Sequence, residues 1–289
     1  MNLSLNCLTK RYGEKVALDN VSMIFEKGVY GLLGPNGAGK STLMNIVVGN
    51  LPASGGSVTV DGEDTRKMGV RFRSLLGYMP QQQRLYDHFS GRDFLMYMAV
   101  LKGVPKDIIA ARVNEIAEQV NMREELKHRL GAYSGGMKQK ILIASAIIND
   151  PDILILDEPT AGLDPKERIR LRNLISRIAL DKLVIIATHV VLDVEYISRQ
   201  IILLNKGKVL RNKTIPELTD EIKDYVYMIT AAVDDLPRVE DSYQVSSIQS
   251  DGKIAHIRII SEMPPTGYRF ERAIPTLEDV YLYFFGAFD

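Results

Sequence analysis

The chain has no tryptophan and only one cysteine, Cys7, among its 289 residues. A lone cysteine cannot form an internal disulfide, so the composition excludes a disulfide-stapled scaffold and fits a reducing cytoplasm. The chain also lacks a net charge, because 36 lysines and arginines balance 36 aspartates and glutamates. This balance gives no reason to expect nucleic acid as a partner.

Long apolar runs are missing as well. Apolar stretches such as residues 141–148 are less than half the length needed to cross a membrane, and residues 1–4 do not resemble the start of a signal peptide. If the protein serves a membrane process, we expect another chain to supply the membrane-spanning part.

The most informative segment that is present is a glycine-rich loop of the form G-x-x-x-x-G-K-S. It follows a strand-like apolar stretch, residues 29–33, and precedes a segment that can open a helix, residues 43–48. In this context glycines let backbone N–H groups surround a phosphate at the positive end of the helix. We predict that Lys40 bridges the β- and γ-phosphates of a nucleotide and that the Ser41 hydroxyl binds Mg²⁺. The nucleotide-binding loop consists of Gly34, Pro35, Asn36, Gly37, Ala38, Gly39, Lys40, Ser41 and Thr42.

Two acids, Asp157 and Glu158, end a continuous apolar run at residues 153–156. A second apolar run, residues 183–187, follows a helical stretch, which is the pattern of a parallel sheet buried on both faces. Neighbouring strand residues face opposite ways, and ligands bind at the carboxyl ends of parallel strands. We therefore expect Asp157 to hold Mg²⁺ and Glu158 to polarise an attacking water. Without the upstream loop, solvated acids at a strand end would be the simpler explanation.

The remaining segments outline two domains. We expect residues 1–212 to form an α/β domain, with antiparallel strands over 3–26 and a helical insertion at about 84–150. Beyond a composition shift near 214–216 we expect an accessory domain, residues 213–289. Its predicted elements are strands at 225–233 and 254–260, a hairpin turn at Asp251-Gly252, and a final helix capped by Thr276 and Asp279.

A third segment, Tyr133-Ser134-Gly135-Gly136-Met137, lies between the loop and the two acids. Ser134 can cap the following helix, and the glycines leave N–H groups at the helix start open to an anion. The segment resembles the signature motif of the ABC ATPase family, whose usual form is L-S-G-G-Q; Tyr133 and Met137 depart from it. Taken alone, such a triplet is an ordinary helix start, so the resemblance depends on its position between the other two motifs.

Four further positions match motifs of that family. Tyr12 resembles the aromatic residue that stacks on adenine, and Gln81 resembles the glutamine that senses Mg²⁺ and the attacking water. Gln82 is an alternative to Gln81, because three glutamines follow Pro80. Asp164 lies in a segment similar to the D-loop, and His189 resembles the switch histidine.

The resemblance implies a P-loop NTPase fold: a mostly parallel sheet flanked by helices, an N-terminal antiparallel β-subdomain, a helical signature subdomain and a small α+β extension. It implies ATP and Mg²⁺ as ligands and catalysis by Glu158, His189, Lys40 and Gln81. It further implies a second ATP-binding subunit, a copy or a paralogue, whose Ser134, Gly135 and Gly136 complete the nucleotide site. A separate transmembrane permease would hold the protein at the inner face of the cell membrane.

The direction of transport is suggested by the C-terminus. Residues 275–281 resemble the last helix of ATPase subunits in bacterial drug and bacteriocin exporters, so we expect export. Two alternatives stay open. A soluble ABC-type ATPase acting on ribosomes or nucleic acid fits less well with a single ATPase domain and zero net charge. A nucleotide-regulated module with little turnover is the other, because Met137 replaces the usual glutamine.

Overall fold

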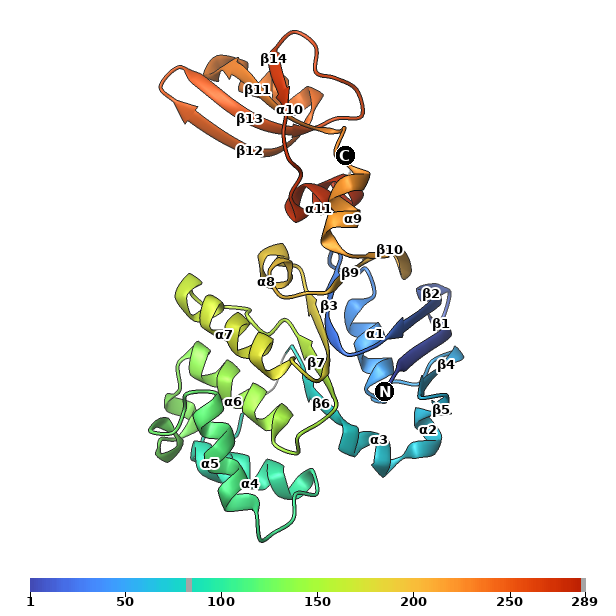
Figure 1. Ribbon diagram of the computed structural model, residues 1–289, viewed down its shortest axis with the longest axis vertical. Helices are drawn as coiled ribbons and strands as arrows, with labels where there is room; N and C mark the ends of the chain where they lie inside the picture. The colour runs from blue at the N-terminus through green and yellow to red at the C-terminus, as the bar shows by residue number, and fades with distance from the viewer. Residues whose placement is uncertain (82–84, 287–289) are drawn as a thin grey trace.

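The computed structural model describes residues 1–81 and 85–286. Its centre is a six-stranded sheet in the order β10-β9-β3-β8-β7-β6, in which only the pairing of β10 with β9 is antiparallel. The predicted parallel sheet is confirmed (Figure 1). The strands are β3 (Gly28–Leu33), β6 (Leu76–Met79), β7 (Ile153–Asp157), β8 (Leu183–Thr188), β9 (Gln200–Asn205) and β10 (Lys208–Lys213).

One face of the central sheet is covered by α1 (Lys40–Val47) and by a second, antiparallel sheet in the order β2-β1-β4-β5. Alternate residues of the central strands, such as Ile153 and Ile155, enter this first hydrophobic cluster. The predicted N-terminal antiparallel strands are therefore confirmed. The remaining elements of this region are β1 (Leu3–Tyr12), β2 (Lys15–Phe25), β4 (Gly55–Val60), β5 (Glu63–Asp64), α2 (Thr65–Met68) and α3 (Val70–Leu75).

The other face carries the helical elements, and the intervening strand residues, such as Leu154 and Leu156, pack against them in a second cluster. The helical insertion predicted at about residues 84–150 is confirmed, as is the helix after Ser134. The elements on this face are α4 (Gly91–Leu101), α5 (Ile109–Gln119), the short 3-10 helices η1 (Glu125–Lys127) and η2 (Leu130–Ala132), α6 (Gly135–Ile147), α7 (Pro165–Ile178) and α8 (Val191–Glu195).

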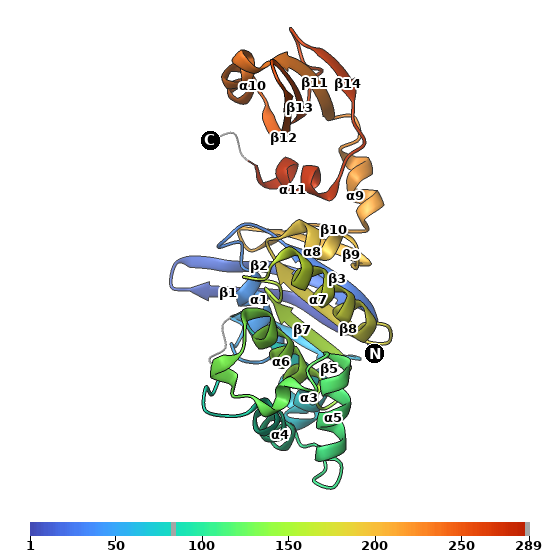
Figure 2. The same ribbon diagram turned by 90° about the vertical axis from the view of Figure 1, so that its left-hand side faces the viewer.

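The C-terminal region contains a third sheet, in the order β12-β13-β11-β14, that projects from one end of the molecule (Figures 1 and 2). The predicted hairpin at Asp251-Gly252 and the capping box of Thr276 with Asp279 are confirmed. The elements are α9 (Ile215–Glu221), β11 (Val226–Ala232), η3 (Val233–Asp235), α10 (Leu236–Ser242), β12 (Gln244–Asp251), β13 (Ile254–Ile260), β14 (Arg269–Arg272) and α11 (Leu277–Phe285).

The C-terminal helices α9 and α11 belong to a different core from the C-terminal sheet. The sheet and α10 enclose a small cluster of their own, which includes Ile229, Val239 and Ile257. By contrast, Leu277 and Val280 of α11 are fully buried in the cluster that covers the central sheet. The expected boundary between residues 212 and 213 thus precedes two helices, α9 and α11, that pack against the first 212 residues.

None of the helices formed by the described residues combines the length and the hydropathy that a membrane crossing requires.

Candidate functional site

Strand register brings the sequence motifs together at one edge of the central sheet. Leu33, the last residue of β3, lies opposite Thr188 of β8, and Asp157 of β7 lies opposite Ala187. The glycine loop leaves β3 at this edge, and Glu158 and His189 follow β7 and β8 at the same edge. Motifs that are more than a hundred residues apart in the chain thereby become neighbours.

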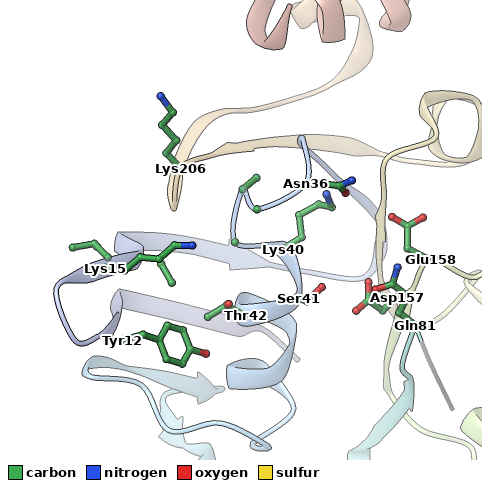
Figure 3. A pocket seen from close by; sticks show the side chains of 15 residues that line it. Tyr12, Lys15, Asn36, Lys40, Ser41, Thr42, Gln81, Asp157, Glu158 and Lys206 are labelled. Carbon is green, nitrogen blue, oxygen red and sulfur yellow. The ribbon is translucent and has the colours of Figure 1, made fainter. Parts of the chain in front are cut away.

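These segments surround a cleft of about 580 Å³. Figure 3 shows Tyr12 and Lys15 on one side of the cleft and the two acids with Gln81 on the other, with Lys40 and Ser41 between them. The cleft is lined by Tyr12, Lys15, Val16, Ala17, Asn36, Gly37, Ala38, Gly39, Lys40, Ser41, Thr42, Gln81, Asp157, Glu158 and Lys206.

The glycine loop has the backbone that its sequence predicts. Gly37 and Gly39 have φ angles of +81° and +109°, in the region that side-chain-bearing residues rarely adopt. A Cβ on Gly39 would also lie 2.7 Å from the carbonyl oxygen of Ala17. Glycine is therefore required at position 39 both for its dihedral angle and for the close approach of strand β2.

Lys40 is a buried cation that points back onto its own loop. Its Nζ donates hydrogen bonds to the carbonyl oxygens of Gly34 at 2.6 Å and Pro35 at 3.2 Å. Burial lowers the pKa of Lys40, while the nearby charges of Glu158 and Asp157 act in the opposite direction. A buried ammonium group with only neutral acceptors is well suited to bind an anion in the cleft.

Asp157 supplies a carboxylate close to the Ser41 hydroxyl. Burial, with the neighbouring charge of Glu158, raises the pKa of Asp157 to about 6, although Lys40 and a hydrogen bond from Ser41 oppose this change. Together with the amide of Gln81, these groups offer the oxygen ligands that Mg²⁺ prefers. The described residues contain no cluster of three His, Cys, Asp or Glu side chains suited to a metal.

Glu158 is held in an uncommon backbone conformation, with φ of +51°. Its N–H donates to the carbonyl oxygen of Ala187 at 2.8 Å. Its Oε1 accepts from the backbone N–H of His189 at 3.1 Å and lies 2.7 Å from the Nδ1 atom of the same histidine. Its Oε2 accepts from the Thr188 hydroxyl at 3.0 Å. The carboxylate is thus oriented by both residues that follow Ala187.

Several predicted site residues lie outside the cleft lining. Ser134 caps α6 by accepting from the N–H of Met137 at 3.3 Å, as predicted, and Ser134 and Gly135 are exposed. Tyr133, by contrast, is buried. Its hydroxyl donates to the carbonyl oxygen of Glu125 at 2.7 Å, which attaches the segment to the protein interior. The exposed start of α6 remains accessible to another molecule. Gly136 lies beside Glu167 of α7.

Asp164 is exposed and caps α7, because its carboxylate accepts from the N–H of Glu167 at 2.9 Å. His189 reaches the cleft only through its contact with Glu158. Gln82, the alternative to Gln81, lies outside the described residues.

Sequence reasoning missed Thr188 and four residues of the cleft lining: Lys15, Val16, Ala17 and Lys206. The first three follow Tyr12 closely in the chain, so their position next to a predicted nucleotide contact could have indicated that they line the cleft. Lys206 had none, because only the tertiary structure packs its turn on the glycine loop, where the N–H of Gly207 donates to the carbonyl oxygen of Ala38 at 2.8 Å. Figure 3 shows the Lys206 side chain directed away from that loop.

Comparison with known proteins agrees with this geometry. The model of the ABC transporter family matches residues 18–161. The chain is 31% identical to an uncharacterized ABC transporter ATP-binding protein, YxlF of Bacillus subtilis, over 97% of this chain and 98% of that protein. It is also 31% identical to Nod factor export ATP-binding protein I of Burkholderia orbicola, over 94% of this chain and 93% of the relative.

A solved structure extends the agreement to the fold. The dimeric structure of MJ0796, a bacterial ABC transporter cassette, has a TM-score of 0.67 and 26% identity, covering 73% of this chain and 98% of that one. The chain therefore belongs to the family of ABC transporter ATP-binding proteins.

Proposed function

We propose that the protein is the ATP-hydrolysing subunit of a membrane exporter and that it works as an ATP-driven dimer. The observation that carries this proposal is the meeting of Lys40, Asp157 and Glu158 around one cleft, with His189 in contact with Glu158. These groups supply an anion site, a carboxylate for a cation and an oriented base, which phosphoryl transfer requires together.

Nucleotide binding is assigned to the cleft lining. Tyr12 is half exposed at one end and stacks on the adenine. The loop from Gly34 to Thr42 holds the phosphates through its backbone N–H groups, and Lys40 leaves its carbonyl partners for the β- and γ-phosphates. Ser41, Asp157 and Gln81 would hold Mg²⁺, which would neutralise part of the phosphate charge.

Catalysis is assigned to Glu158. Its carboxylate orients and deprotonates the attacking water, while His189 keeps the Oε1 atom in place. Lys40 stabilises the charge that develops on the γ-phosphate. Because Glu158 already has three hydrogen-bonding contacts, its orientation needs little rearrangement before the reaction.

Dimer formation is assigned to the start of α6. Ser134, Gly135 and Gly136 lie outside the cleft of their own chain, and the exposed N–H groups there can bind the γ-phosphate held by a partner subunit. Asp164 is exposed at the start of α7, and Gly162, two residues before it, has its carbonyl oxygen close to Gly135 at the start of α6. The similar cassette MJ0796 has been solved as a dimer.

A docking surface for the permease is assigned to three aromatic residues just before and within α4. Tyr86, Phe89 and Tyr97 form an exposed aromatic cluster, with ring centroids 5.2 to 6.1 Å apart. Exposed apolar groups of this kind are typical of interaction surfaces. Such docking would place the protein on the cytoplasmic face of the membrane.

Export is the preferred direction of transport because the similar Burkholderia protein is named for Nod factor export.

Glu158→Gln tests the catalytic assignment. The amide keeps the shape of the side chain but is a poor base, so we expect ATP turnover to fall at least a hundredfold while ATP affinity stays within twofold. Turnover and nucleotide binding are measured on the purified full chain and with its permease. Glu278→Gln, at an exposed position, is the matched control and should behave as the parent. Hydrolysis at the parent rate in Glu158→Gln would refute the assignment.

A further inference from the structure

A hydroxyl group to which the proposed mechanism gives no separate role is buried against the catalytic carboxylate. Thr188 is the last residue of β8 and has no exposed surface. Its Oγ1 atom lies 3.0 Å from Oε2 of Glu158. Polar groups buried to this degree are costly unless their hydrogen bonds are made, so this contact contributes to the local structure.

The direction of this hydrogen bond is set by a second one. The backbone N–H of Val190 donates to Thr188 Oγ1 at 3.0 Å. An N–H cannot accept, so the hydroxyl oxygen is the acceptor in that pair, and the hydroxyl proton is left for Glu158. A carboxylate oxygen with an O–H donor at 3.0 Å gains a charge-assisted hydrogen bond.

The two oxygens of Glu158 are thus held by residues in different environments. Oε1 faces His189, whose side chain is 57% exposed, whereas Oε2 faces the fully buried Thr188. An exposed imidazole is free to change rotamer when a ligand or partner subunit arrives. A buried β-branched side chain at the end of a central strand is not, because its rotamer is restricted and its neighbours are packed.

From this geometry we infer that Thr188 is a positioning residue for hydrolysis: its hydroxyl fixes the plane and direction of the Glu158 carboxylate independently of His189. The inference rests on the proposed role of Glu158 as the base. Thr188 is not among the residues that line the cleft, so it acts on the rate of the chemical step and leaves ATP affinity unchanged.

The test compares Thr188→Val with Thr188→Ser in the full chain. Valine preserves the shape but removes the hydroxyl, which leaves Oε2 without its buried donor. Serine keeps the hydroxyl. We expect kcat for ATP hydrolysis to fall about ten- to a hundredfold in Thr188→Val and to stay within about threefold of the parent in Thr188→Ser, with KM for ATP unchanged in both. Single-turnover hydrolysis with excess protein and Mg²⁺ provides the rate of the chemical step.

Thr188→Ala and Thr188→Ser form a second pair, which differ only in the hydroxyl and decide the question if valine is poorly tolerated. Equal losses with and without the hydroxyl, a change confined to KM, or parent activity in Thr188→Val would each overturn the inference. Glu158→Gln is assayed in parallel. If that variant retains turnover, the proposed function itself fails; if it is inactive while Thr188→Val is fully active, only the role of Thr188 fails.

Discussion

At the scale of single residues, the cleft contains charges that the ligand-free protein accommodates at a cost. Lys40 and Asp157 are both buried, and each has a pKa shifted toward its neutral form, mainly because water is excluded. Buried charges with shifted pKa values are common at functional sites, because a bound ligand can supply the opposite charge that the ligand-free protein lacks. Stability and function should therefore respond in opposite directions at Asp157.

Asp157→Asn should stabilise the ligand-free protein, and more so at high pH. The pKa of Asp157 is raised from 3.8 to about 6, so the folded state binds the proton more tightly, and this stability is lost as the pH rises through 6. Asparagine does not titrate, so the variant does not lose this stability. The difference in free energy of unfolding between Asp157→Asn and the parent should therefore be about 1 kcal/mol larger at pH 8 than at pH 5. Denaturant unfolding at both pH values, without Mg²⁺ or nucleotide, measures this difference. An equal advantage at both pH values would contradict the prediction.

At the scale of elements, α11 links the C-terminal sheet to the site. The N–H of Leu277 lies 3.4 Å from Oε1 of Glu195 at the end of α8, the helix that begins two residues after His189. On its other side, Asp279 of α11 accepts hydrogen bonds from the Arg258 guanidinium of β13 at 2.6 to 3.1 Å. The short last helix is thus held between the ATPase part and the third sheet.

Asp279→Asn should destabilise the protein by about 3 kcal/mol, because it breaks a buried ion pair and leaves the Arg258 charge uncompensated. Asp279 has no exposed surface; burial raises its pKa, but hydrogen bonds from Arg258 and Thr276 outweigh burial, so the pKa is lowered. The stability that Asp279 contributes is therefore present above pH 4 and lost on further acidification. Chemical denaturation at pH 7 measures the loss. The exposed neighbour variant Glu278→Gln should change stability by less than about 0.5 kcal/mol, and equal effects of the two would refute the role of the pair.

At the scale of the whole molecule, the described residues form three hydrophobic clusters, and membership in a cluster does not follow the order of the chain. Two of them lie on opposite faces of the central sheet and include residues of nearly every element up to α9. The third is formed by the C-terminal sheet together with α10. Residues 227–272 can therefore lose structure locally, whereas Val226 and α11 belong to the large cluster and should unfold with the ATPase part.

Ile257→Ala tests this division. Ile257 is fully buried in the small third cluster, and truncating such a side chain costs about 2–4 kcal/mol. Hydrogen exchange of β11, β12 and β13 should become faster, while exchange in α11 and the affinity for ATP stay unchanged. The measurement is hydrogen exchange read by mass spectrometry on the full chain. Faster exchange throughout α11, or a loss of ATP affinity, would show that the sheet and the cleft share one cooperative unit.

The sequence by itself determined the local chemistry of this protein. The glycine loop, the acids after a buried strand and the Ser134 cap depend on backbone dihedrals and on hydrogen bonds within a few residues, which short segments encode. For the same reason, the strands around residues 153–156 and 183–187 and the final helix were predicted at nearly the observed positions, whereas β9, β10 and β14 were not predicted.

Only the tertiary structure decided what lies beside these segments. The register of β3, β7 and β8 brings Lys40, Glu158 and His189 together. The turn at Lys206 packs on the glycine loop, and α11 joins the hydrophobic cluster that covers the central sheet. The Thr188 hydroxyl, which no motif singled out, likewise gained its carboxylate partner from strand pairing. Such contacts depend on how side chains from distant parts of the chain pack together in the interior, and no single segment contains that information.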